Sequence, residues 1–250
     1  GEGLWSNGVS FFRGFLVTLR CKPFLQLCIA TFLVFNGFML VSSFSSYVII
    51  FYVYGGDRDL GSQLIGWNGT ASAIATFCVI PLVTMISTRI GKRKAFFMAV
   101  GISVFGYALK FFCYSQEHPL LLLASTPFIA FGLGGLFTLM GSMVADVCDF
   151  DELETGHRRE GMFGSIFWWV VKLGMALALG ISGFLLNATG FDVEAAGAQP
   201  ERTLFLMRLF DVGVPIVTSL VAIWTISAYP ITEEKARQTR ELLEARRGRN

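Results

Sequence analysis

Six long apolar runs, separated by short clusters of charge, constrain this chain more than any other feature. A run of about 18 or more apolar residues is long enough to cross the ~30 Å hydrocarbon core of a bilayer as a helix. Lipid offers no hydrogen-bond partners to the backbone, so each run must satisfy its own amides and carbonyls, which a helix does. Only 15% of the residues are charged, against about 25% in a typical soluble domain. The sequence therefore predicts an integral membrane protein built from helices.

The charges and turn residues between the runs set the expected helix boundaries. The predicted helices cover about 24–54, 61–88, 94–114, 119–148, 160–187 and 203–228. At ~1.5 Å per residue, the fourth is longer than the hydrocarbon core is thick, so it must tilt or extend into water. We expect residues 24–228 to form an all-α, six-helix transmembrane domain.

Two amphipathic or charged segments flank this domain. In residues 1–23, Phe11, Phe12 and Phe15 can share one helical face with the basic residues elsewhere, which is typical of a linker with an interfacial amphipathic helix. Residues 229–250 are highly charged and helix-prone. We expect them to form a tail that is solvated or lies on the lipid surface.

The distribution of lysine and arginine predicts the orientation. Most of the 20 basic residues lie in the N-terminal flank, in "RIGKRK" (89–94), at Arg158 and Arg159, and in the tail. All four segments fall on the same side of a six-span protein, and short cytoplasmic segments carry an excess of positive charge. We therefore expect both termini to be cytoplasmic. We also expect the location to be a bacterial inner (plasma) membrane, which the charge count does not address.

Motifs for catalysis and for cofactor binding are absent. The sequence has no nucleotide-binding glycine loop and no hydrolase nucleophile motif. The five cysteines and two histidines show no metal-ligand spacing. We expect no enzyme activity, no cofactor, no metal site and no nucleic-acid partner, which leaves transport or a structural role in the membrane.

Lys172 is the most informative polar residue inside a predicted span. It lies in "FWWVVKLGMALALG", residues 167–180, ~18 Å along the fifth run. A lysine there costs several kcal/mol unless it reaches the interface, meets water or pairs with an acid. We see no acid near the middle of a span, so we expect Lys172 to face an aqueous cavity and to pair with a solute or with another polypeptide. The alternative is a lysine that reaches the interface because the helix ends elsewhere.

Polar residues in the first two runs add candidates for a solute cavity. Asn36 and Tyr47 lie in the first run, and Trp67 and Asn68 lie in the second. Their side chains can hydrogen-bond a polar solute, and a tryptophan can stack on a sugar. Such groups also tie membrane helices together, at roughly 0.6–2 kcal/mol per contact. Both interpretations remain open for Asn36 and Asn68.

Between the fourth and fifth runs, residues 145–165 read "ADVCDFDELETGHRREGMFGS", a block with six acids and two arginines. It matches, at fixed spacing, the pattern D-x-x-D-[YF]-x-E-x-x-T-G-x-R-x-E-G. This pattern resembles the signature of the glycoside–pentoside–hexuronide:cation symporters, the melibiose-permease-like branch of the major facilitator superfamily. Phe150 stands where tyrosine is more usual. The matching positions are Asp146, Asp149, Phe150, Glu152, Thr155, Gly156, Arg158, Glu160 and Gly161.

Other segments extend this resemblance over nearly the whole chain. "LRCKPFLQL" (19–27) resembles the family's segment that enters the seventh helix, and "RIGKRK" resembles its loop between helices eight and nine. Lys172 falls where the family has a lysine in helix eleven, facing the transport cavity. The resemblance implies the C-terminal half of a twelve-helix fold, with two three-helix units related by inverted topology.

The resemblance also implies a function. The chain would be half of a secondary active transporter that couples a sugar or related polar solute to Na⁺ or H⁺ by alternating access. Its partners would be the lipid bilayer, the solute and an N-terminal six-helix half, which in this family carries most of the coupling-cation site. A homo-oligomer is also possible.

Within this frame, the charged block would act as a cytoplasmic gate or latch. Its acids can accept hydrogen bonds from its own arginines or from basic groups of the other half, in pairs that form in one conformation and break in another. Gly156 is expected to permit the turn, and Thr155 to cap the next helix. The alternative is that the block only fixes helix ends and topology. The gate candidates are Asp146, Asp149, Glu152, Thr155, Gly156, Arg158, Arg159 and Glu160.

Two further functions compete with sugar symport. A lysophospholipid transporter of the same fold would use Lys172 to meet a phosphate or another anionic head group. A non-transporting membrane subunit or assembly factor would use the six helices as a scaffold. The sequence leaves the solute, the coupling ion and the direction of transport open.

Overall fold

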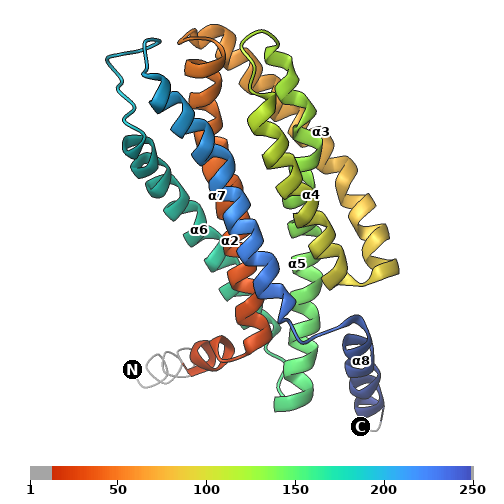
Figure 1. Ribbon diagram of the computed structural model, residues 1–250. Coiled ribbons are helices and arrows are strands. Elements are labelled where there is room, and N and C mark those ends of the chain that lie inside the picture. The colour runs from red at the N-terminus through yellow and green to blue at the C-terminus, as the bar shows by residue number, and fades with distance from the viewer. Residues whose placement is uncertain (1–12, 249–250) are drawn as a thin grey trace.

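Six membrane-length helices lie side by side in the computed structural model, which describes residues 13–248 (Figure 1). The predicted all-α fold with six spans is confirmed. The spans are α2 (Lys22–Tyr47) continued by the π-helix η1 (Val48–Val53), α3 (Arg58–Ile90), α4 (Lys92–Cys113), the 3₁₀ helix η2 (Pro119–Ala124) followed by α5 (Thr126–Thr155), α6 (Glu160–Ala188) and α7 (Glu201–Ser227).

Local signals explain most helix ends. The Asp57 carboxylate accepts hydrogen bonds from the backbone N–H groups of Asp59 and Leu60, at 3.0 and 3.1 Å, and so caps the start of α3. Gly91, with φ 88°, provides the sharp turn between α3 and α4. The fourth span differs most from its predicted range, because α5 continues through the acidic residues to Thr155.

The N-terminal flank is described only in part. Residues 13–19 are helical, and Phe15 and Leu19 pack against the main hydrophobic core. Phe11 and Phe12, which the predicted interfacial helix includes, lie outside the described residues. The interfacial helix therefore stays a prediction.

The helices pack in two connected groups. α2 lies along α6 and α7, α5 lies along α3 and α4, and α4 also meets α7. Small residues allow the closest contact between α4 and α5: a Cβ on Gly135 would lie 2.5 Å from the Ala99 side chain, and one on Gly106 would lie 2.8 Å from the backbone nitrogen of Ile129. Such glycines bring membrane helices close together.

Both described ends of the chain lie at the same end of the bundle (Figure 1). The turn from α3 to α4, with its basic residues, and the end of α5 also lie there. The basic segments that were predicted to share one side of the membrane therefore lie at one end of the bundle. That this end is cytoplasmic stays a prediction.

Gly106→Ala tests the α4–α5 contact. The added methyl group would meet backbone atoms of Phe128 and Ile129 at 2.8–3.0 Å, and overpacking of this kind costs about 1–3 kcal/mol. We expect a lower midpoint of thermal unfolding in detergent. Gly101→Ala on the same helix is the control, because no atom lies within 4 Å of its added Cβ. Equal midpoints for the two variants would contradict the packing.

Candidate functional site

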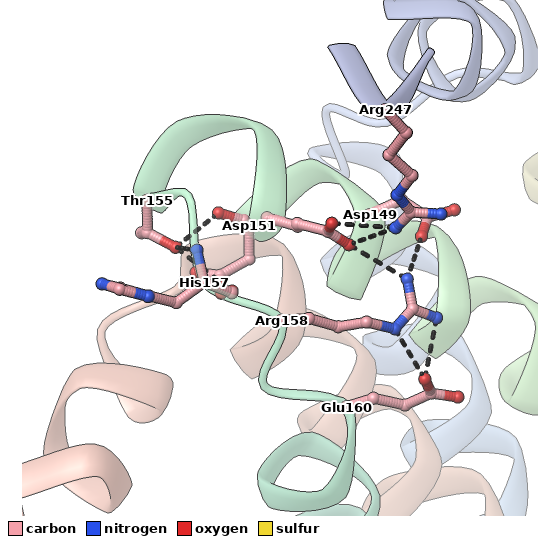
Figure 2. Close-up of polar contacts among 8 residues, drawn as sticks. Asp149, Asp151, Thr155, His157, Arg158, Glu160 and Arg247 are labelled. Carbon is pink, nitrogen blue, oxygen red and sulfur yellow. Dashed lines mark hydrogen bonds and ion pairs between the residues drawn. The ribbon is translucent and has the colours of Figure 1, made fainter. Parts of the chain in front are cut away.

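The charged block is the end of a helix rather than a loop. α5 runs to Thr155, and Gly156 ends it with a left-handed φ of 73°. The N–H of Gly156 donates to the Glu152 carbonyl at 2.8 Å, which closes the last turn. The predicted turn at Gly156 therefore agrees with the structure. The prediction that Thr155 caps the next helix is wrong, because its hydroxyl donates back to the Asp151 carbonyl at 2.8 Å (Figure 2).

Arg158 links three carboxylates of this block. Figure 2 shows its guanidinium between the end of α5 and Glu160 at the start of α6. It donates to Glu160 Oε2 from Nε at 3.0 Å and from Nη2 at 2.7 Å, and Nη1 donates to Glu152 Oε2 at 3.0 Å. Asp149 Oδ1 lies 3.5 Å from the same Nη1. The hydrogen bonds to Glu160 and Glu152 raise the pKa of Arg158.

A second pair, Arg159 with Asp151, crosses the same turn. Arg159 binds both carboxylate oxygens, with Nε donating to Oδ2 at 3.0 Å and Nη2 to Oδ1 at 2.5 Å. Asp151 is buried, so this two-point pair is better shielded from water than the Arg158 cluster. Asp151 was not among the predicted gate residues, because the family pattern leaves its position free.

The acids are also bound by the C-terminal helix α8 (Glu233–Arg247). Arg247 Nη2 donates to both oxygens of Glu152, at 2.8 and 2.9 Å (Figure 2). The Lys235 ammonium lies 4.9 Å from the centre of the Phe150 ring. Ala236 and Leu243 are buried. One face of α8 therefore docks on the end of α5, while most of its residues are exposed.

Asp146 joins this network from one side. Its Oδ2 accepts from Lys92 Nζ at 2.6 Å, and its Oδ1 lies 3.9 Å from Arg240 on α8. The block thus has partners on α4, on the α5–α6 turn and on α8. The contacts with α4 and α8 join segments far apart in the chain, which explains why the spacing of the motif did not reveal them.

The predicted cavity residues do not form one site. Lys172 is exposed on α6, with the exposed Trp168 one turn before it. Asn36 packs against α6: its Nδ2 donates to the Phe32 carbonyl at 2.7 Å, and a Cβ on Gly174 would lie 2.5 Å from that nitrogen. Asn36 therefore packs closely against α6, but its hydrogen bond stays within α2.

The two aromatic candidates lie outside the cavity that Asn68 lines. Tyr47 packs with Phe51 and Phe191, with ring centroids 6.3 and 5.4 Å away. Trp67 is exposed on α3. Neither side chain lines a cavity with Asn68.

Asn68 does line a polar cavity of about 250 Å³ between α2, α3 and the start of α5. Its Oδ1 accepts from the Thr126 hydroxyl at 2.6 Å, so the side chain also ties α3 to α5. Serine and threonine hydroxyl groups share the rest of the lining with apolar side chains such as Phe38 and Ile129. The polar lining residues are Ser42, Ser45, Ser46, Asn68, Ser72, Lys110, Ser125 and Thr126.

A buried ion pair adjoins this cavity, and its lysine, Lys110, is one of the lining residues. Lys110 Nζ on α4 lies 3.2 Å from Asp211 Oδ2 on α7, and both side chains are at most 4% exposed. The Tyr114 hydroxyl donates to the same carboxylate oxygen at 2.6 Å and lies 3.0 Å from the Ser45 hydroxyl. The expectation of no acid inside the spans is therefore wrong. Asp211 lies roughly 15 Å along α7, but its partner is Lys110 and not Lys172.

A second, apolar cavity of about 280 Å³ lies between α2, α5 and α6. Phe137, Met140, Phe167 and Val171 are among its lining side chains, with Trp168 at the same face of α6 as Lys172. The two cavities differ in their side chains: the first has more serine and threonine residues, and the second has more large apolar ones.

Comparison with known proteins identifies the class. Residues 5–233 match the family described as MFS/sugar transport protein. The chain belongs to this family, and the resemblance to melibiose-permease-like transporters is confirmed. The family is one of transporters and not of enzymes.

Individual relatives show the range within the family. The chain is 27% identical to human sodium-dependent lysophosphatidylcholine symporter 1, over 98% of this chain and 44% of that protein. It is 29% identical to the glucuronide carrier protein homolog of Escherichia coli (strain K12), over 88% of this chain and 46% of that protein. An uncharacterized symporter of Synechocystis is 26% identical, over 84% of this chain and 38% of that protein. The chain therefore spans less than half the length of these relatives.

Asp211→Ala tests the buried pair. It would leave the Lys110 ammonium buried without a counter-charge, which costs about 3–5 kcal/mol. We expect a large drop in the midpoint of thermal unfolding, and substantial recovery in the double variant Asp211→Leu with Lys110→Met. Glu201→Ala is the control, because Glu201 is an exposed acid on the same helix. A small effect of Asp211→Ala, like that of the control, would contradict the pair.

Proposed function

We propose that this chain forms the C-terminal half of a secondary active transporter that carries a polar solute together with Na⁺ or H⁺. An N-terminal six-helix half would face it across a central cavity, and the two halves would rock about a site near the middle of the membrane. Both termini would lie in the cytoplasm, and a bacterial inner membrane would be the location.

The observation that carries this proposal is Lys172. It is exposed about midway along an apolar, membrane-length helix, and its side chain has no ion-pair partner within residues 13–248. A charge in that position is costly unless it faces water, a solute or an opposite charge. A cavity shared with a second half satisfies this need, and it would place the ammonium beside the solute.

A sugar-like solute is favoured by the hydroxyl-rich cavity beside Asn68. Serine and threonine hydroxyls both donate and accept hydrogen bonds, which suits the hydroxyl groups of a sugar. The similarity to a glucuronide carrier homolog supports the same class of solute.

A lysophospholipid is the second candidate, and the apolar cavity between α5 and α6 favours it. An acyl chain would lie in that cavity while its phosphate met Lys172, which follows Trp168 by one helical turn. The similarity to a lysophosphatidylcholine symporter supports this alternative.

Lys172→Ala tests the proposed role in transport. The experiment uses the complete transporter in proteoliposomes, with uptake of a labelled glucuronide, a neutral glucoside and lysophosphatidylcholine under Na⁺ or H⁺ gradients. We expect uptake of the carried solute to fall at least tenfold, with Lys172→Arg losing less because it keeps the charge. Thermal unfolding should stay unchanged, because the side chain is exposed.

Arg202→Ala is the matched control, because Arg202 is an exposed cation near the end of α7 away from the charged block. Full uptake by Lys172→Ala would refute the assignment to the cavity. Absence of uptake of any solute by the wild-type protein would favour the non-transporting subunit.

The charged block is proposed as a cytoplasmic latch. Its acids are occupied in this structure by Arg158, Lys92 and arginines of α8, so contact with the other half would require an exchange of partners. The Arg158 and Arg247 side chains are about half exposed, and pairs of that kind contribute only about 0–1 kcal/mol each. Several of them can therefore exchange without a large barrier, as a latch requires.

Arg158→Ala tests the latch. The arginine is 45% exposed, so we expect little change in thermal stability but at least a threefold loss of uptake, because one conformation loses its ion pairs. Arg237→Ala is the control: Arg237 makes a similar exposed pair with Glu234, at 2.7 Å, away from α5. Equal uptake by the two variants would contradict the latch.

A further inference from the structure

A cavity of about 540 Å³ opens at the same end of the bundle as the charged block, between the α3–α4 turn and the start of α8. Lys92, Arg93 and Lys94 line it from the first turn of α4, and Glu233 and Glu234 line it from α8. The lining of this cavity includes neither Lys172, the proposed contact with the solute, nor the residues of the Arg158 cluster. The cavity lies between the first turn of α4 and the start of α8.

The two acids of the cavity already have cationic partners. Glu234 accepts from Arg237 at 2.7 Å, and Glu233 lies 3.9 Å from Arg240. Both arginines belong to α8. Arg240 also lies 3.9 Å from Asp146 and Arg237 lies 4.0 Å from Glu241, so the two arginines offset these carboxylates only in part.

The three cations on α4 are less well balanced. Lys92 pairs with Asp146 at 2.6 Å. Arg93 uses Nη1 to donate to a backbone carbonyl, but a guanidinium has five N–H donors. Lys94 is exposed and makes no ion pair within the described part of the chain. With no acid in the first turn of α4, these cations lie at the positive end of the helix dipole, which favours an anion beside them.

An apolar groove continues from this cavity along the outer face of the bundle. Phe97 lines both spaces. The groove, of about 530 Å³, follows α4 from Phe97 to Phe105, a rise of ~12 Å, and Phe128 of α5 forms its far wall. No atom lies within 4 Å of the position that a Cβ of Gly101 would occupy, so the middle of the groove is open.

We propose that the cavity and the groove together bind one anionic phospholipid. Arg93 and Lys94 would bind the phosphate, and an acyl chain would lie in the groove beside Gly101. The charge balance favours an anionic head group such as phosphatidylglycerol over a zwitterionic one. This lipid is a bound partner of the outer surface rather than cargo, so the inference stands apart from the identity of the solute.

Lipid titration with native mass spectrometry tests this site in the complete transporter, purified in detergent. We expect phosphatidylglycerol to bind more tightly than phosphatidylcholine or phosphatidylethanolamine. Each cation removed should weaken that binding about fivefold, so Lys94→Gln should show a fivefold loss and Arg93→Gln with Lys94→Gln a larger one. Lys94→Gln alone is included because Lys94 is exposed, so this substitution should leave the fold intact.

One variant separates binding of the acyl chain from binding of the head group. A second variant separates a specific lipid site from a general effect of surface charge. Gly101→Leu fills the groove and should weaken phosphatidylglycerol binding while leaving all cations in place. Glycerol 3-phosphate alone should bind far more weakly than the lipid, and tight binding of it would point to a free-phosphate site and overturn the proposal. The control, Arg58→Gln with Arg202→Gln, removes two cations from other parts of the surface. Equal phosphatidylglycerol affinity in this control and in the Arg93/Lys94 variant would also overturn it.

Discussion

Polar groups that enter the hydrocarbon are costly unless they find a partner, and this constraint shapes much of the structure. For the backbone it selects helices. For side chains it selects contacts such as the buried Lys110–Asp211 pair, which joins α4 to α7, and the Tyr114–Ser45 contact, which extends the same network to α2. The few polar groups of the spans therefore decide which helices lie beside each other, while apolar side chains and glycines determine how closely they pack.

The water-exposed end of the bundle follows a different rule, because exposed ion pairs are individually weak. Here the acids of α5 are shared among several cations, with Arg158 and Arg247 both bound to Glu152. Shared partners let one contact be replaced by another at small cost. The rigid, buried pair and the exchangeable surface cluster thus lie in different parts of the same six helices, and the proposed movement needs both.

The sequence predicted the six spans well because hydropathy and helix length are local properties, and "RIGKRK" and Gly156 mark turns that local signals reveal. It did not predict contacts between distant segments. Lys110 and Asp211 lie on helices that are not adjacent in the sequence, and only the fold brings them together. The docking of α8 on Glu152 was missed for the same reason, since its charges alone suggest a solvated tail. Asn36 shows a third limit, because the sequence alone does not distinguish a polar side chain that lines a cavity from one that packs between helices.

The buried pair has a consequence for assembly of the protein in the membrane. Lys110 is synthesised three helices before Asp211, so α4 must enter the bilayer while its lysine has no counter-charge. The position of Lys110 in the last turn of α4 lets the long side chain extend toward the head groups during that interval. Only after α7 inserts can the ammonium withdraw between the helices. The order of insertion is thus built into the depth at which each charge lies, and the pair closes as a late step of folding.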